Sequence, residues 1–196
     1  MKPPPPDSSS LSDTQQTEAQ QQWIRAAVNQ YERPLIHYAA RLVGDVDLAR
    51  DVVQDTFLKL WTADRCEIEA HIAQWLYRVC RNRALDVRRR EIRMTALDDR
   101  HVESRPDRNA EPASAAHTHE ADGMLAILQS LPERQQEVIR LKFQGGLSYK
   151  EIANVMNLTV NHVGVLIHTG LKALREQLAA AGNSTNQPSA DASVSR

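Results

Sequence analysis

The stretch DLARDVVQDTFLKLW, residues 47–61, decides the fold. Its apolar and small side chains recur every three or four residues, which places them on one face of an α-helix. Gly44 ends the preceding segment, and Asp47 is expected to cap the start of this helix. The stretch therefore predicts an amphipathic helix packed against other helices. Its buried face comprises Ala49, Val52, Val53, Thr56, Phe57 and Leu60.

Helical periodicity continues on both sides of this stretch, over residues 21–93. Upstream, apolar residues keep helical phase from Ile24 to Leu42, and Pro34 is expected to mark a kink or a new helical start. Downstream, a loop at 63–67 precedes a longer helix with an apolar face. The block is predicted to be a helical bundle. That face comprises Ile72, Trp75, Leu76, Val79 and Cys80, the last an ordinary buried thiol.

The composition favours a helical protein outside the membrane. The chain has 196 residues with 5% aromatic residues, and its mean hydropathy is −0.51. No apolar run approaches the roughly 18 residues that cross a bilayer. The Pro- and Ser-rich start lacks the pattern of a signal peptide. We therefore expect a cytoplasmic protein without membrane insertion.

Charge is unevenly distributed although the net charge is only −1. Residues 78–93 contain seven arginines against Asp86 and Glu91, whereas residues 94–122 contain three arginines against seven acids. A basic helical stretch indicates a polyanion partner or, equally, a solvated helix end. The charge run alone does not decide between them.

A second periodic block follows. Ser130 to Glu133 and Ser148 to Glu151 both have the S-x-x-E pattern of a capping box, and Asn157 is suited to a left-handed helix end. Thr159 can cap a further helix, so the spacing predicts a helix-turn-helix. The apolar face of that last helix comprises Val160, Val163, Ile167, Leu171, Leu174 and Leu178.

These patterns predict an all-α protein with two small helical domains joined by a flexible linker. The domains span residues 21–93 and 123–180, and the second is the helix-turn-helix. Residues 94–122 form the acidic linker. The polar tails at 1–20 and 181–196 are expected to be disordered, because they have too little apolar surface to offset the entropy of ordering.

The ordered set of 47–61, WLYRVCRNRALDVRRR (75–90) and LPERQQEVIRLKFQGGLSYKEIANVMNLT (131–159) resembles bacterial RNA polymerase sigma factors. Within the sigma-70 family it is similar to the extracytoplasmic-function (ECF) group, which keeps only domains two and four. The resemblance implies a promoter-specificity subunit that is not an enzyme and needs no cofactor. Its implied partners are core RNA polymerase, promoter DNA and an anti-sigma factor.

On the 47–61 helix, polar residues and one leucine form a stripe opposite the buried face, which favours a docking surface over a solvated face. The resemblance implies that this stripe contacts the polymerase. The expected polymerase-binding residues are Asp51, Gln54, Asp55 and Leu58.

The arginine-rich helix has cations for phosphates and side chains for exposed bases. The resemblance implies that it reads the minus-10 element and holds the strands apart. Trp75 and Tyr77 are candidate stacking groups, although Trp75 keeps the phase of the core, and Asp86 is expected to orient arginines through ion pairs. The candidate DNA-binding residues are Arg78, Arg81, Asn82, Arg83, Arg88 and Arg89.

The helix from Val160 is the candidate reader of the minus-35 element, but it departs from the family. Gly164, Leu166 and Thr169 stand where similar proteins carry Lys or Arg, so we expect weak phosphate affinity. Val165 and Leu166 are expected to be exposed and to contact thymine methyls, a protein partner or another part of the chain. The remaining candidate contacts are Thr159, Asn161, His162, His168, Lys172 and Arg175.

Other functions explain less of the sequence. A polymerase-independent helix-turn-helix regulator leaves residues 47–61 and 78–90 without a role, and an interaction protein that has lost DNA binding remains open. An enzyme lacks support, because no phosphate-binding loop or nucleophile motif occurs. His117 and His119, with Glu120 and Asp122, lie in a flexible polar segment without cysteines, so no metal site is predicted.

Overall fold

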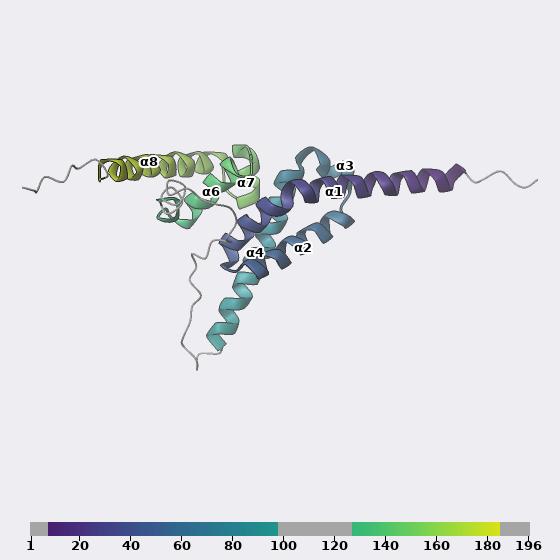
Figure 1. Ribbon diagram of the computed structural model, residues 1–196, viewed down its shortest axis with the longest axis horizontal. Coiled ribbons are helices and arrows are strands. Elements are labelled where there is room, and N and C mark those ends of the chain that lie inside the picture. The colour runs from purple at the N-terminus through teal and green to yellow at the C-terminus, as the bar shows by residue number, and fades with distance from the viewer. Residues whose placement is uncertain (1–7, 98–126, 185–196) are drawn as a thin grey trace, which may run out of the picture. The chain divides into compact units, whose positions relative to one another are not determined.

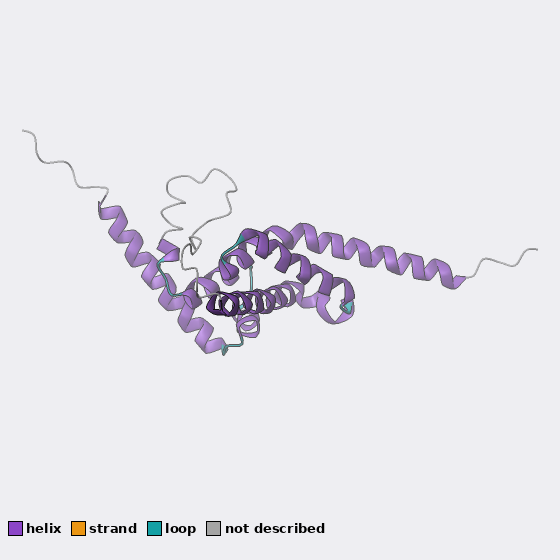
Figure 2. Cartoon of the chain, turned by 90° about the horizontal axis from the view of Figure 1, so that it is seen from below, coloured by secondary structure: helices purple, strands orange, loops and turns teal. Residues whose placement is uncertain are grey.

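The structure is a computed structural model that describes residues 8–97 and 127–184. Within these ranges every regular element is a helix (Figures 1 and 2). The chain divides into two compact units, and each is described by itself. The prediction of two helical domains is confirmed, while the linker between them lies outside the described residues.

The first unit contains three long helices and a short connection. They are α1 (Ser8–Val43), α2 (Val46–Thr62), α3 (Arg65–Ile68), the 3₁₀ turn η1 (Glu69–His71) and α4 (Ile72–Leu97). α1, α2 and α4 pack on one another around an apolar core. In Figure 1 the C-terminal part of α4 extends beyond α1 and α2. The fully buried side chains of this core include Leu35, Val52, Thr56, Leu60, Leu76 and Cys80.

Buried polar groups in this core are hydrogen-bonded. The Thr56 hydroxyl donates to the Val52 carbonyl at 2.8 Å, so burying it does not leave an unsatisfied donor. Tyr38 and Tyr77 are both buried and meet edge to face, with 5.2 Å between ring centroids. Burial raises the pKa of the Tyr77 hydroxyl to about 12 and that of the Cys80 thiol to about 12. Tyr77 is therefore a core residue, and its expected role as a stacking group is wrong.

Several helix boundaries differ from those expected. α1 begins at Ser8, inside the tail expected to be disordered, and no Gly or Pro interrupts it before Pro34. It continues through Pro34 without ending. An interior proline costs about 3 kcal/mol, and burial of the next residue, Leu35, offsets part of this cost. α4 continues to Leu97, beyond the expected end at residue 93.

The cap of α2 is Asp45 and not Asp47. Gly44 has a positive φ of 82°, which ends α1 and leaves Asp45 as the extended residue before the helix. The Asp45 carboxylate accepts hydrogen bonds from the backbone N–H groups of Asp47 and Leu48, each at 2.8 Å. Residues 65–68, expected to be a loop, form the short helix α3 behind its own cap, Asp64.

The second unit contains a single helical turn at 127–129 followed by α6 (Glu133–Phe143), α7 (Tyr149–Met156) and α8 (Val160–Ser184). α7, the left-handed Asn157 (φ 55°) and α8 form the predicted helix-turn-helix. The capping box of Ser148 and Glu151 is confirmed, as is the Thr159 cap, whose hydroxyl accepts from the His162 N–H at 3.2 Å. α8 continues into the expected tail, to Ser184.

The capping box expected at Ser130 is not formed. Glu133 is the first residue of α6, so its side chain does not occupy the third position that a capping box needs. The Ser130 hydroxyl instead donates to the Ile127 carbonyl at 2.7 Å. Pro132 precedes α6 without a side-chain cap. Within 8–97 and 127–184, no helix is long and apolar enough to cross a membrane.

Candidate functional site

The predicted stripe on α2 faces outward. Asp51, Gln54 and Leu58 are exposed, and 60% of Leu58 is accessible to solvent. Leu58 and Trp61 are both exposed and lie three residues apart on α2, so together they form a continuous apolar surface of the kind found at docking sites. Asp55 differs from the other three because it is only half-exposed.

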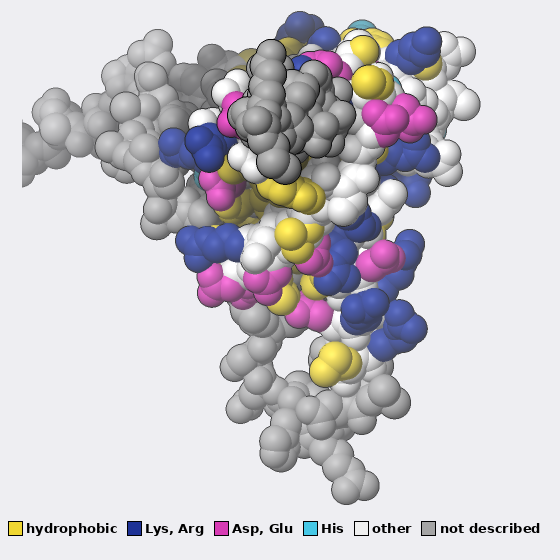
Figure 3. Space-filling model, turned by 90° about the vertical axis from the view of Figure 1, so that its right-hand side faces the viewer, with side chains coloured by type: hydrophobic (Ala, Val, Ile, Leu, Met, Phe, Trp, Pro, Cys, Tyr) yellow, Lys and Arg dark blue, Asp and Glu magenta, His cyan; other side chains and the backbone are white. Residues whose placement is uncertain are grey.

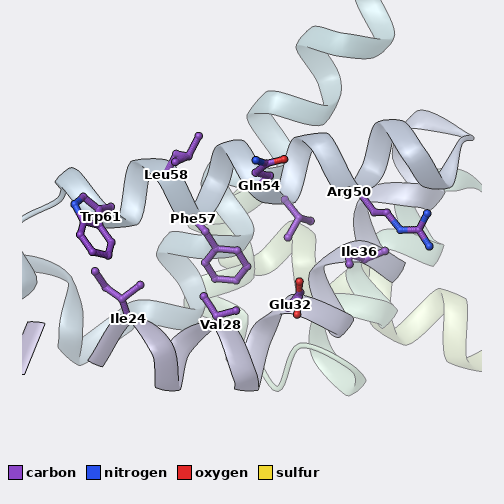
Figure 4. A pocket seen from close by; sticks show the side chains of 10 residues that line it. Ile24, Val28, Glu32, Ile36, Arg50, Gln54, Phe57, Leu58 and Trp61 are labelled. Atoms are coloured by element: carbon purple, nitrogen blue, oxygen red, sulfur yellow. The ribbon is translucent and has the colours of Figure 1, made fainter. Parts of the chain in front are cut away.

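A groove of about 490 Å³ lies beside this stripe, between α1 and α2. In Figure 4, Trp61 of α2 lies opposite Ile24 of α1, and Phe57 lies opposite Val28. Trp61 is 57% exposed. Phe57 is half-buried and lines the groove, whereas it was expected in the core. The spacing of Trp61, four residues after Phe57 and three after Leu58, was the sequence signal for this apolar surface.

An ion pair connects two residues that were expected to act separately. Nε of Arg83 donates to Oδ2 of Asp55 at 2.7 Å, and their side chains are 30% and 39% exposed. This pair joins α4 to α2. A partly exposed pair of this kind contributes at most about 1 kcal/mol, but it fixes both side chains. Asp55 and Arg83 therefore have a structural role within the first unit.

The remaining arginines of α4 give this helix a basic surface. Four of them are exposed, namely Arg78, Arg89, Arg90 and Arg93, and so is the neighbouring Asn82. Arg81 and Arg88 are half-buried, and each has an interaction partner. Figure 3 shows dark-blue Lys and Arg side chains gathered on one side of α4. The surface is turned away from the core of its own bundle.

Two features modify this basic surface. Oδ1 of Asp86 lies 2.9 Å from a guanidinium nitrogen of Arg89, which is an ion pair of the kind expected for this acid. Ile92 and Met94 are exposed among the arginines, so this part of α4 also carries apolar surface. Neither residue was predicted from the sequence. Trp75 is half-buried, which places it at the edge of the core.

On α8, the predicted contact residues lie on the solvent side. Thr159, Asn161, His162, His168, Lys172 and Arg175 are all exposed. Lys172 lies 3.9 Å from Glu176, which offsets part of its positive charge. The expectation of an exposed Val165 is confirmed, but Leu166 is half-buried and the expectation that it is exposed is wrong.

Within the described ranges there is no group of three or more His, Cys, Asp or Glu side chains that could hold a metal ion. The segment with His117 and His119 lies outside these ranges. Cys66 is exposed and Cys80 is buried, and both thiols are free.

Comparison with known protein families assigns both units. The model of sigma-70 region 2 matches residues 27–94, and the model of sigma-70 region 4 matches residues 122–174. The chain therefore carries two regions of sigma-70 transcription factors, region 2 followed by region 4. Sigma factors are regulatory proteins of transcription initiation and not enzymes.

Curated relatives narrow the class. The ECF RNA polymerase sigma factor SigL of Mycobacterium tuberculosis is 30% identical over 161 residues, which cover 78% of this chain and 86% of SigL. SigW of Bacillus subtilis is 28% identical, with coverage of 77% and 86%. SigE of Mycolicibacterium smegmatis is 31% identical over 82% of this chain, but the match spans only 63% of SigE. The chain belongs to the ECF sigma factors of the sigma-70 family.

Two solved structures share the fold. The sigma factor RpoE of Bartonella quintana, solved in complex with the anti-sigma factor NepR, aligns with a TM-score of 0.58 at 23% identity, over 79% of this chain and 96% of RpoE. CnrH, solved with the cytosolic domain of CnrY, aligns with a TM-score of 0.52 at 24% identity, over 82% and 90%.

Proposed function

We propose that this sigma factor recognises a minus-10 element through α4, helps to separate the strands there, and recognises a minus-35 element through α8. The observation that carries the proposal is the basic surface of α4, which faces solvent and projects beyond α1 and α2. Arginines facing solvent on one helix suit a phosphate backbone. This role implies a cytoplasmic location.

Three kinds of group on α4 support contact with a single strand. Exposed arginines such as Arg78 and Arg89 supply positive charge, Asn82 supplies an amide for a base edge, and Ile92 and Met94 supply apolar contact. Separated bases expose both hydrogen-bonding edges and flat faces, so this combination suits an unpaired strand better than a closed duplex.

Docking on the polymerase is assigned to α2. Asp51 and Gln54 offer polar contacts, and Leu58 and Trp61 offer exposed apolar surface beside them. A partner that buries a leucine of this kind gains about 1.5–3 kcal/mol, while the acid contributes to orientation. We also infer an anti-sigma partner, because the two structural neighbours were solved with NepR and with the cytosolic domain of CnrY.

The proposal is tested by reconstitution. The purified chain is mixed with bacterial core RNA polymerase and a promoter library, and both complex formation and transcripts are measured. Leu58→Asp should weaken the complex at least tenfold, because 1.4 kcal/mol corresponds to tenfold in Kd. Leu178→Asp, at another exposed leucine, is the matched control. No complex with the unmodified chain would refute the proposal.

Strand separation needs a separate readout. Arg78→Ala combined with Arg89→Ala should reduce transcription from closed promoters more than from templates with a pre-melted minus-10 region. Arg134→Ala, at an exposed arginine of α6 in the second unit, controls for loss of charge. Equal losses on both templates would contradict a role in strand opening.

The second candidate is a regulator that binds duplex DNA without polymerase, and the helix-turn-helix of α7 and α8 favours it. Gel-shift assays of the chain alone and with core polymerase distinguish the two. We expect sequence-specific binding only with the polymerase, because the first four turns of α8 carry a single lysine and no arginine.

A further inference from the structure

The orientation of α8 defines a single outward stripe. Val163, Ile167 and Gly170 are buried and fix the inner face. The opposite face follows helical spacing of i, i+4, i+7 and i+11, and every residue on it is exposed. Its members are Asn161, Val165, His168 and Lys172.

This stripe begins at the N-terminus of the second helix of the helix-turn-helix. In this motif the N-terminal residues of the second helix reach base edges in the major groove. Val165 lies in the middle of the stripe and is 58% exposed. A β-branched aliphatic side chain therefore occupies the position at which a base contact is expected.

Valine has no hydrogen-bonding group, so it can select a base only by apolar contact. On the major-groove edge of a base pair, the only apolar group is the C5-methyl of thymine. The Thr169 hydroxyl, one turn further, does not compete for the base, because it donates to the carbonyl of Val165 at 2.8 Å and lies 3.2 Å from that of Leu166.

Asn161, one turn before Val165, complements this contact. Among the described residues its side-chain amide has no hydrogen-bond partner. An Asn amide can pair with both N6 and N7 of adenine. The stripe therefore presents an adenine-type contact beside a thymine-type contact.

Guanine is disfavoured by what the helix lacks. Arg and Lys are the usual partners of guanine O6 and N7, and none occurs between Val160 and Leu171. The first cation of the stripe, Lys172, lies eleven residues after Asn161, about 16 Å along the axis. The shorter side chains before it allow the helix to lie close to the base edges.

A protein partner suits this face less well. Val165 is the one apolar residue of the stripe and lies between Asn161 and His168. Its neighbour Leu166 is half-buried. Protein interfaces need a contiguous apolar patch, whereas a single methyl group needs only one aliphatic side chain. The geometry favours DNA as the occupant.

We propose that Val165 selects a thymine in the upstream promoter element by contact with its C5-methyl, beside an adenine held by Asn161. This inference rests on the proposed function, because it requires α8 in the major groove. According to this proposal, the N-terminal part of α8 recognises A·T pairs.

The experiment uses holoenzyme reconstituted from the full chain and core polymerase. Promoters are selected from a library with randomised upstream and minus-10 segments, and each thymine of the selected upstream element is then replaced by deoxyuridine, which lacks only the methyl. At one thymine the unmodified holoenzyme should lose about fourfold in promoter affinity, the factor expected for one buried methyl.

Val165→Ala removes the proposed contact without lowering helix propensity. This variant should lose about fourfold on the thymine promoter, and deoxyuridine should cause no further loss. Val160→Ala is the matched control, because Val160 is an exposed valine on α8 outside the stripe. It should respond to deoxyuridine as the unmodified chain does. Circular dichroism checks that both variants are folded.

Selection of G·C pairs opposite Val165 would overturn the inference, and so would an equal response to deoxyuridine in the unmodified chain and Val165→Ala. In both cases the unmodified holoenzyme still transcribes, so the proposed function stands. If it yields no transcript from any library member, the proposed function fails and the inference fails with it.

Discussion

Two glycines of α8 have different surroundings, and alanine at each should change the unfolding free energy of the second unit differently. A Cβ at position 164 would lie 3.9 Å from Cε2 of Tyr149, an ordinary van der Waals contact. A Cβ at position 170 would lie only 2.8 Å from Cδ1 of Ile139. Gly170 is therefore where α6 and α8 approach each other closely.

The expected magnitudes follow from these distances. Alanine stabilises a helix interior by about 1 kcal/mol relative to glycine. Gly164→Ala should gain this amount and raise Tm by about 4–8 °C for a small domain. Gly170→Ala gains the same propensity, but the Cδ1 methyl of Ile139 must move to make room. Because Ile139 is buried, this movement overpacks its surroundings, at a cost of about 1–3 kcal/mol. It should leave stability unchanged or reduce it by up to about 2 kcal/mol.

Hydrogen exchange measured by mass spectrometry on peptides of α6 and α8 reports the second unit directly. All three tryptophans lie in the first unit, at positions 23, 61 and 75, so tryptophan fluorescence should not change and serves as the internal control. Ile139→Val removes the Cδ1 methyl. In the Gly170→Ala background it should cost at least about 1 kcal/mol less than alone. If Gly170→Ala stabilises as much as Gly164→Ala, the close approach of α6 and α8 is refuted.

Three further predictions concern stability and reactivity. A thiol reagent should label exposed Cys66 rapidly and buried Cys80 only on unfolding; equal rates would contradict the core assignment. Burial raises the pKa of Cys80 from 9.0 to about 12, so its stabilising contribution is complete below pH 9 and is lost as pH rises toward 12. Urea unfolding should show this loss as a fall in the unfolding free energy of up to about 1.4 kcal/mol per pH unit. Tyr77 adds to the fall above pH 10. Cys80→Ala should make the fall between pH 9 and 10 less steep. Asn157→Gly should preserve the left-handed turn, whereas Asn157→Ala should cost about 1 kcal/mol in chemical unfolding, and equal stabilities would refute this.

Elements with strong local signals were predicted well. α2 follows from the spacing of its apolar residues, and the turn between α7 and α8 follows from Asn157 and the two caps around it. Helix starts were harder, because a cap works only at one position relative to the first helical residue. Asp45 and Asp47 are both suitable capping residues, and the positive φ of Gly44 favours the first.

Most outward positions of α2 and α8 could also be predicted, because periodicity separates buried from exposed positions within one helix. It failed at the margins of α8, where Val160 and Leu178 were expected on the apolar face but are exposed, and Leu166 is half-buried. Contacts between helices could not. The pair of Arg83 and Asp55 joins residues 28 positions apart, and the groove beside Trp61 needs α1 and α2 in register. Tyr77 follows Trp75 by only two residues, yet it is buried against Tyr38 while Trp75 is half-buried.

The pairing of Asp55 with Arg83 has a consequence for genetics. Under the proposed function, loss of the Asp55 carboxylate disturbs both the docking surface of α2 and the basic surface of α4, because it also releases the Arg83 guanidinium on the neighbouring helix. Single alleles at either position are thus ambiguous. Exchanging the charges of Asp55 and Arg83 in one double variant restores the attraction between α2 and α4 but changes the exposed surface of both helices. Recovery in this variant indicates a structural role of the pair, whereas continued loss indicates a role in binding.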